Sequence, residues 1–252
     1  MRKNDISAVD IALALVLLTR LPLPRLSSGS FQRQSKAIWA FPLAGLAVTL
    51  PACLVACTAL TLGLTTEVTA GLFLMVQVLL TGAMHEDGLA DCADGFWGGF
   101  DPSRRLEIMK DSQIGSYGVL ALIFAIGLRW QALALVLDHG QVWSLLALAL
   151  LSRAMMPVLM YALPNARQSG LSQSVGRPSR RAVSLGLGLA VALSLPLLGF
   201  VTFALLAMLA LMTLGLGLLA RSKIGGQTGD VLGACQQICE ISGVLLLVAT
   251  VS

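Results

Sequence analysis

Seven long apolar runs separated by short loops constrain this chain more than any other feature of its sequence. A helix needs about 20 apolar residues to cross the roughly 30 Å hydrocarbon core of a bilayer. The runs are continuous rather than alternating, and only helices or closed barrels can span lipid. We therefore expect seven membrane-spanning helices. They cover about residues 41–64, 68–85, 116–137, 142–163, 182–201, 203–220 and 231–251.

The composition supports this interpretation. Only 12% of the 252 residues are charged and 56% are hydrophobic, whereas soluble domains carry about 25% charged residues. Low hydrophobicity is what disorder requires, so a disordered chain is excluded. No linker rich in Pro, Gly or Ser divides the chain into two cores. We expect one all-α integral membrane domain that covers residues 1–252.

Basic residues predict the side of the membrane that each loop faces, because Lys and Arg collect in cytoplasmic loops. Of the 17 basic residues, only Arg129 and Arg153 fall within predicted spans. The others lie before the first span or in alternate loops, and the remaining loops contain no Lys or Arg. This pattern fits one orientation, in which all the basic loops are cytoplasmic. The loop 164–181, rich in Ser, Gln, Arg and Gly, is expected to be a mobile cytoplasmic segment.

Residues 6–19 form an apolar run that is too short to span a bilayer as a helix. Asp10 interrupts the run, and basic residues flank both ends, with Arg2 and Lys3 before it and Arg20 after it. If both flanks are cytoplasmic, the segment cannot cross. We predict an interfacial or re-entrant helix.

The strongest chemical signal is the acidic run at 85–99, His-Glu-Asp-Gly-Leu-Ala-Asp-Cys-Ala-Asp-Gly-Phe-Trp-Gly-Gly, at the cytoplasmic end of the second predicted span. Asp87, Asp91 and Asp94 have the spacing i, i+4, i+7, which places three carboxylates on one helical face. Each carboxylate costs roughly 2.5–3.5 kcal/mol at the middle of a membrane helix and less near the interface. A divalent cation offsets this cost directly, and oxygen ligands favour Mg²⁺ or Mn²⁺ over Zn²⁺. We expect a metal site here, beside which His85 is compatible with ligation, base catalysis or simple hydrogen bonding.

A glycine-rich motif at 225–230, Gly-Gly-Gln-Thr-Gly-Asp, precedes the last predicted span. Glycines let the backbone approach a ligand and expose N–H groups, and a helix that starts here points its positive end at an anion. Asp230 is expected to complete the metal site from the same membrane face. The alternative is a capped helix start after a flexible turn. The candidate substrate-binding residues are Gly225, Gly226, Gln227 and Thr228.

Three further sets of charged residues have open interpretations. Lys110 and Asp111 lie in a third motif, Lys-Asp-Ser-Gln-Ile-Gly-Ser-Tyr-Gly, which is either a phosphate site or a plain amphipathic loop. Glu240 lies inside the last span, where an acid is a functional candidate by default. Arg129 and Arg153 are compatible with structural ion pairs to such an acid.

Taken together, these motifs resemble the adenosylcobinamide-GDP ribazoletransferases, also called cobalamin 5′-phosphate synthases. The resemblance runs nearly end to end. It is carried by Thr-Arg-Leu-Pro-Leu-Pro at 19–24, Phe-Pro-Leu-Ala-Gly at 41–45, His-Glu-Asp-Gly-Leu-Ala-Asp at 85–91 with Asp94-Gly95, Met-Lys-Asp-Ser at 109–112 with Gly115 and Gly118, and Gly-Gly-Gln-Thr-Gly-Asp at 225–230 with Leu232-Gly233.

The resemblance implies the last assembly stage of cobalamin biosynthesis. The enzyme transfers the phosphocobinamide moiety of adenosylcobinamide-GDP onto a ribose hydroxyl of α-ribazole or α-ribazole 5′-phosphate. GMP leaves, and adenosylcobalamin or its 5′-phosphate forms. The family is Mg²⁺-dependent and resides in the bacterial inner membrane. The distribution of basic loops predicts that the active site faces the cytoplasm. Whether the chain forms a homo-oligomer is left open.

Phosphoryl transfer depends mainly on positioning and on neutralising developing charge. The resemblance therefore assigns one or two Mg²⁺ ions to Asp87, Asp91, Asp94 and Asp230. The proton of the ribose hydroxyl passes to Glu86 or His85. The residues expected to bind GDP phosphates are Lys110, Arg104 and Arg105.

Two alternatives use similar features. The CDP-alcohol phosphotransferases of phospholipid synthesis also cluster aspartates on membrane helices, but their pattern begins Asp-Gly-x-x-Ala-Arg. Here Asp87-Gly88-Leu89-Ala90 is followed by Asp91 instead. A transporter would place its site near the bilayer midplane between repeated halves, whereas these acids cluster at one face and no repeat is visible.

Overall fold

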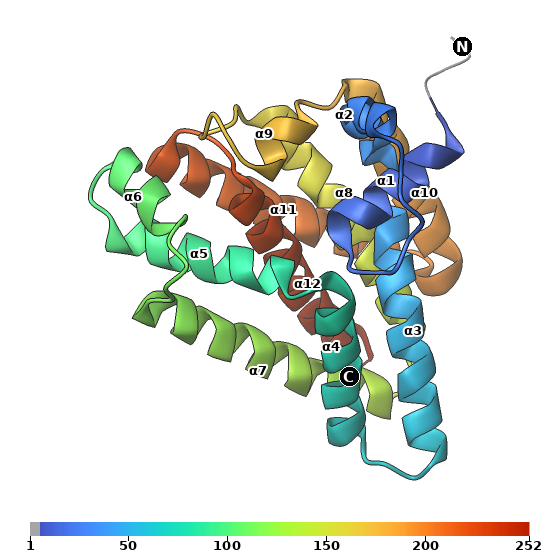
Figure 1. Ribbon diagram of the computed structural model, residues 1–252. Helices are drawn as coiled ribbons and strands as arrows, with labels where there is room; N and C mark the ends of the chain where they lie inside the picture. The colour runs from blue at the N-terminus through green and yellow to red at the C-terminus, as the bar shows by residue number, and fades with distance from the viewer. Residues whose placement is uncertain (1–5, 252) are drawn as a thin grey trace.

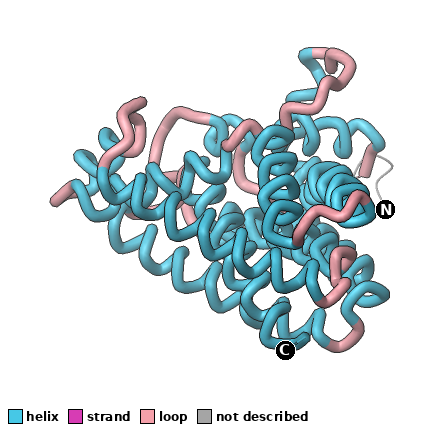
Figure 2. The backbone as a smooth tube through the Cα atoms, turned by 90° about the horizontal axis from the view of Figure 1, so that it is seen from below, coloured by secondary structure: helices cyan, strands magenta, loops and turns pink. Residues whose placement is uncertain are grey.

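A computed structural model describes residues 6–251, which form helices and loops with no strand (Figure 2). The bounds of the helices are α1 (Ala8–Leu18), the 3₁₀ helix η1 (Ser28–Arg33), α2 (Gln34–Ala37), the 3₁₀ helix η2 (Ile38–Ala40), α3 (Phe41–Thr61), α4 (Thr66–Thr81), α5 (Met84–Gly98), α6 (Pro102–Ile108), α7 (Ser116–Asp138), α8 (Ser144–Ala162), α9 (Leu171–Val175), α10 (Arg180–Leu198), α11 (Val201–Ile224) and α12 (Gly229–Val251). The all-α prediction is confirmed.

Six helical stretches in the described residues are long and apolar enough to cross a membrane, and they contain α3, α7, α8, α10, α11 and α12. A seventh crossing exists only if α4 and α5 count together, and these two helices meet at 87° (Figure 1). The chain is therefore a multi-pass membrane protein. The prediction of about seven spans holds in this sense.

The span predicted over 68–85 is broken near its end. Helix α4 ends at Thr81, and the chain turns through Gly82 (φ 65°) and Ala83 (φ 56°) before α5 begins at Met84. Both residues have left-handed backbone, which interrupts a right-handed helix. The acidic motif consequently forms its own helix, which leaves the span almost at a right angle.

Helix α8 forms the centre of the bundle, since nearly all of its residues from Ser144 to Met160 are buried. It packs against α3, α10 and α12, and α12 also packs against α5, α7 and α11. Large apolar side chains on the outer helices are exposed, as expected for a surface that faces lipid. Examples are Phe124 of α7 and Leu211, Leu214 and Leu218 of α11.

The N-terminal helix α1 has 11 residues, or about 16 Å of length, and therefore cannot span a bilayer. Its Asp10 is fully buried. Arg33 Nε donates to Asp10 Oδ1 at 2.9 Å, and Trp39 Nε1 donates to Oδ2 at 3.1 Å. Burial acts to raise the pKa of Asp10, but these hydrogen bonds outweigh burial and hold the pKa below its ordinary value. The predicted non-spanning helix is confirmed; Arg2 and Lys3 lie outside the described residues.

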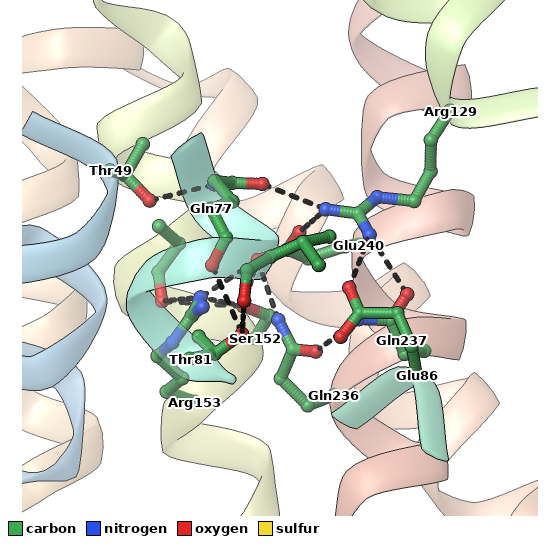
Figure 3. A network of polar contacts seen from close by, with 12 residues as sticks. Thr49, Gln77, Thr81, Glu86, Arg129, Ser152, Arg153, Gln236, Gln237 and Glu240 are labelled. Carbon is green, nitrogen blue, oxygen red and sulfur yellow. Dashed lines mark hydrogen bonds and ion pairs between the residues drawn. The ribbon is translucent and has the colours of Figure 1, made fainter. Parts of the chain in front are cut away.

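Four buried charged side chains join α5, α7, α8 and α12 (Figure 3). Glu240 of α12 accepts hydrogen bonds from Arg129 of α7 at 2.5 Å and from Arg153 of α8 at 2.7 Å. Arg129 also lies 3.2 Å from Glu86 of α5. Two arginines thus face two glutamates, which leaves this cluster, here called the buried charge network, without net charge. The predicted structural pairing of both arginines is confirmed.

Amide side chains supply further hydrogen bonds to the buried charge network, in which Glu86 Oε2 and Arg153 Nε have no hydrogen-bond partner among the described residues. Arg129 donates to Gln77 Oε1 at 2.8 Å and to Gln237 Oε1 at 2.9 Å. Gln236 donates to Glu240 at 2.6 Å, and Gln77 donates to Thr49 of α3 at 2.9 Å. Charges held away from water need such partners, because an unpaired one costs several kcal/mol.

We predict that the charge balance of this network makes the stability losses of single variants non-additive in the double variant. Glu86→Gln and Arg129→Gln each leave an uncompensated buried charge, so each should lower the free energy of unfolding by about 3–5 kcal/mol. The double variant restores balance and should lose about 1–3 kcal/mol less than the sum of the single variants. Unfolding of the detergent-solubilised protein measures this. Asp138→Asn, at the exposed end of α7, is the control, and additive losses would contradict the prediction.

Candidate functional site

A cavity of about 290 Å³ lies where α5 meets the start of α12. The loop between α8 and α10 forms another wall, and α1 and α3 contribute apolar side chains. Polar groups therefore converge on a partly apolar hollow, which is the usual character of a small-molecule site. Its polar and charged lining residues include His85, Asp87, Arg167, Gln227, Thr228 and Asp230.

Glycines allow α5 and α12 to approach closely. A Cβ atom added to Gly88 would lie 2.7 Å from the backbone oxygen of Asp230, and one added to Gly233 would lie 3.2 Å from the Cα of His85. Side chains at either position would force the helices apart. The acidic motif and the glycine-rich motif, which lie far apart in the sequence, consequently meet at this cavity.

The three aspartates of α5 have different surroundings. Asp87 is exposed and lines the cavity, while Asp91 is half-buried. The carboxylates of Asp87, Asp94 and Asp230 lie close enough to act electrostatically on Asp91. Like charges this close repel one another. Asp87 and Asp91 of α5 therefore lie near Asp230 of α12.

Asp94 is buried and directed at the start of α7. Its two carboxylate oxygens accept hydrogen bonds from the backbone N–H groups of Gly115 at 2.7 Å and Gly118 at 2.9 Å. A carboxylate is stabilised at the positive end of a helix. A Cβ atom on either glycine would collide with this carboxylate. Asp94 thus makes a structural contact with the motif at 110–118. Metal ligation by Asp94 stays a prediction.

Arg167 is the cavity residue that the sequence interpretation missed. Its guanidinium donates to Asp230 Oδ2 at 2.9 Å and to the backbone oxygen of Leu106 at 3.1 Å. In the sequence it is one of several basic residues in a loop that was expected to be mobile. The only available signal was its position three residues after Pro164 at the end of a span.

Backbone pairing with the glycine-rich motif positions this loop. Gln227 N donates to the oxygen of Pro164 at 2.9 Å, and Ala166 N donates to the oxygen of Gln227 at 2.8 Å. A Cβ on Gly226 would collide with the Pro164 oxygen. Gly225 ends α11 with a left-handed backbone (φ 78°). Among the predicted substrate-binding residues, Gln227 and Thr228 line the cavity, whereas Gly225 and Gly226 shape the turn that holds the loop.

The two candidate bases, His85 and Glu86, are consecutive residues that face different surroundings. His85 is 1% exposed, lines the cavity, and has an Nε2 atom without a hydrogen-bond partner among the described residues. Glu86 Oε1 instead accepts from Arg129 and, at 3.0 Å, from Gln237. Of the two residues, only His85 lines the cavity, and its buried ring lies within electrostatic reach of Arg153, Glu240 and Arg129.

The predicted phosphate-binding side chains of the 104–110 segment do not line this cavity. Arg104 forms an exposed ion pair with Glu107 at 3.0 Å. Arg105 donates to the backbone oxygens of Gly99 and Lys223, both at 2.9 Å. Lys110 is exposed. The geometry thus gives Arg105 a structural contact, and phosphate binding by these three residues stays a prediction.

The acidic residues fit a metal site of a particular kind. Within residues 6–251, no three His, Cys, Asp or Glu side chains converge as a ready-made metal site. Mg²⁺, however, is usually bound by one or two carboxylates together with waters and substrate phosphates. Asp87 and Asp230 line one cavity with Asp91 beside them. This donor set fits a Mg²⁺ site that the substrate completes.

Comparison with known proteins identifies the family. The sequence model of the cobalamin-5-phosphate synthase family matches residues 10–249. A protein named adenosylcobinamide-GDP ribazoletransferase from Sinorhizobium sp is 44% identical, covering 96% of this chain and 97% of the relative. Proteins of the same name from Bradyrhizobium diazoefficiens (44% identical, 95% and 92% covered) and Mesorhizobium japonicum (43%, 96% and 93%) are similar to it as well.

No solved structure matches the chain. The CDP-alcohol phosphotransferase alternative is not favoured. These three relatives match the chain over nearly their whole length, and each is named adenosylcobinamide-GDP ribazoletransferase. The family match and the site geometry agree, since two of the motifs that carry the sequence resemblance, the acidic motif and the glycine-rich motif, meet at the cavity. This chain belongs to the cobalamin-5-phosphate synthase family.

Proposed function

We propose that this chain transfers the phosphocobinamide moiety of adenosylcobinamide-GDP onto a ribose hydroxyl of α-ribazole or α-ribazole 5′-phosphate, with release of GMP. This is the final assembly step of cobalamin. The observation that carries the proposal is the meeting of Asp87 and Asp230 at one cavity, in a chain whose family match covers residues 10–249.

The reaction forms one bond and breaks one. The ribose oxygen bonds to the phosphorus attached to cobinamide, the bond between that phosphorus and the GMP oxygen breaks, and the ribose hydroxyl loses its proton. Asp87, Asp91 and Asp230 would hold Mg²⁺, which neutralises diphosphate charge when bound. Arg167 adds a positive charge at the same cavity, where it can bind a phosphate oxygen. Arg167 and the metal-holding carboxylates would thus position the diphosphate in the cavity.

His85 is the residue we assign to accept the ribose proton. A general base must reach the proton that it removes. His85 lines the cavity, and its Nε2 atom has no hydrogen-bond partner among the described residues. Glu86 is occupied by Arg129 and Gln237. Glu86 then acts indirectly, because its contacts fix the rotation of α5 and so the direction of His85.

The orientation in the membrane follows from the basic loops. Arg167 and the residues that precede Asp230 belong to loops expected in the cytoplasm by the distribution of Lys and Arg. We therefore place the cavity at the cytoplasmic face of the bacterial inner membrane. Both substrates are polar on their reacting ends and would reach the site from the cytosol.

We predict that Asp87→Asn and Asp230→Asn each lower kcat/KM for GMP release by about 100-fold or more, because each removes a charge that holds the metal and the diphosphate. Chelation of divalent cations should abolish release, and added Mg²⁺ should restore it. The assay uses purified protein with adenosylcobinamide-GDP and α-ribazole, and Asp138→Asn is the control. Unchanged turnover in either variant, or turnover only with a CDP-lipid, would refute the proposal.

For His85 we predict a kinetic effect without a stability effect. His85→Gln should lower kcat by about 10²- to 10⁴-fold, the usual contribution of a general base, while the melting temperature stays near that of the wild type. Glu86→Gln should lower the melting temperature as well, because it unbalances the buried charge network. The assignment of His85 fails if His85→Gln retains wild-type kcat.

A further inference from the structure

A second cavity, of about 620 Å³, lies between the segment before α3 and the start of α10. Helices α2 and α10 lie at the same end of the molecule in Figure 1, and α10 packs against η2. The walls of this cavity include Lys36, Trp39, Tyr161, Arg177 and Arg181. It shares no lining residue with the cavity that holds Asp87 and Asp230.

Basic side chains give this second cavity a positive charge. Lys36, Arg177 and Arg181 line it, and none of its lining residues within 6–251 is Asp or Glu. Lys36 is exposed and forms no ion pair with a described residue. Cations gathered around a hollow repel one another, and a bound anion relieves that repulsion.

Arg177 is held in place rather than free to leave the cavity. Its Nε and Nη2 donate to the backbone oxygen of Tyr161 at 3.0 and 2.6 Å, and its guanidinium lies 5.2 Å from the centre of the Tyr161 ring. A fixed guanidinium loses little entropy when it binds an oxyanion. The first turn of α10, which includes Ala182, adds the positive end of a helix to the same cavity.

The remaining walls point to a lipid. Leu185 lines the cavity, is 39% exposed, and belongs to α10, one of the helices able to cross the membrane. Trp39 and Tyr161 are of the aromatic type that collects at the level of lipid headgroups. The cavity therefore joins a cationic hollow to an apolar helix face at the membrane boundary.

We propose that this cavity binds the phosphate of an anionic phospholipid headgroup, with the acyl chains lying along α10 beside Leu185. The phosphates of a free nucleotide share this chemistry. The lipid is the favoured source because the cavity is separate from the reacting site and opens beside an apolar span. Such a lipid would tie α10 to the segment before α3.

Native mass spectrometry of the full-length protein in detergent tests this assignment. The protein is titrated separately with phosphatidylglycerol, phosphatidylcholine and GDP. Lys36→Gln should weaken phosphatidylglycerol binding about fivefold, as expected for one cation at a membrane surface, whereas Lys36→Arg should retain it. Arg180→Gln is the matched control, because Arg180 is exposed and adjacent to Arg181 but does not line the cavity.

The other arms separate the possible sources of phosphate. Phosphatidylcholine and GDP binding should be equal in the wild type and in Lys36→Gln. Equal phosphatidylglycerol affinity in Lys36→Gln and Arg180→Gln would overturn the site. Weakened GDP binding with unchanged lipid binding would assign the cavity to a free phosphate ligand and overturn the lipid assignment. Arg181→Gln provides a second lining variant, and it should weaken phosphatidylglycerol binding in the same direction.

Discussion

The buried charge network of Glu86, Arg129, Arg153 and Glu240 is the interaction on which the rest of this structure depends. Charges are costly inside a membrane bundle, so each must keep its partner. The helices that supply them therefore have little freedom to slide or rotate. Helix α5 needs this constraint most, because it leaves α4 at 87° and is not held as part of a straight span.

Two further contacts hold the acidic face of α5 in place. Asp94 accepts two backbone hydrogen bonds at the start of α7. Gly88 allows the backbone of α12 at Asp230 to pack closely against α5. With Glu86 directed into the bundle and Asp94 directed at α7, Asp87 faces the cavity. The contacts that hold α5 in place thus determine which of its carboxylates can bind a metal or substrate in the cavity.

Much of the fold could be predicted because apolar runs and basic loops are strong signals for membrane helices. The bend at Gly82 and Ala83 could not, since the apolar pattern continues across it and alanine rarely adopts a left-handed backbone. The pairing of distant motifs followed from their shared acidic and glycine-rich character. The part played by Arg167 did not, because it depends on backbone pairing between Pro164, Ala166 and Gln227. Likewise, His85 and Glu86 are neighbours, and only tertiary packing decides which of them borders the cavity.

We propose above all that carboxylates from α5 and α12 share one divalent cation at this cavity. Electron paramagnetic resonance of Mn²⁺ bound in the presence of GDP tests it directly. We expect Asp87→Asn and Asp230→Asn each to weaken Mn²⁺ binding at least about tenfold. Because both carboxylates serve one site, the double variant should bind Mn²⁺ about as weakly as the weaker of the two single variants. Wild-type Mn²⁺ affinity in Asp230→Asn would contradict the claim.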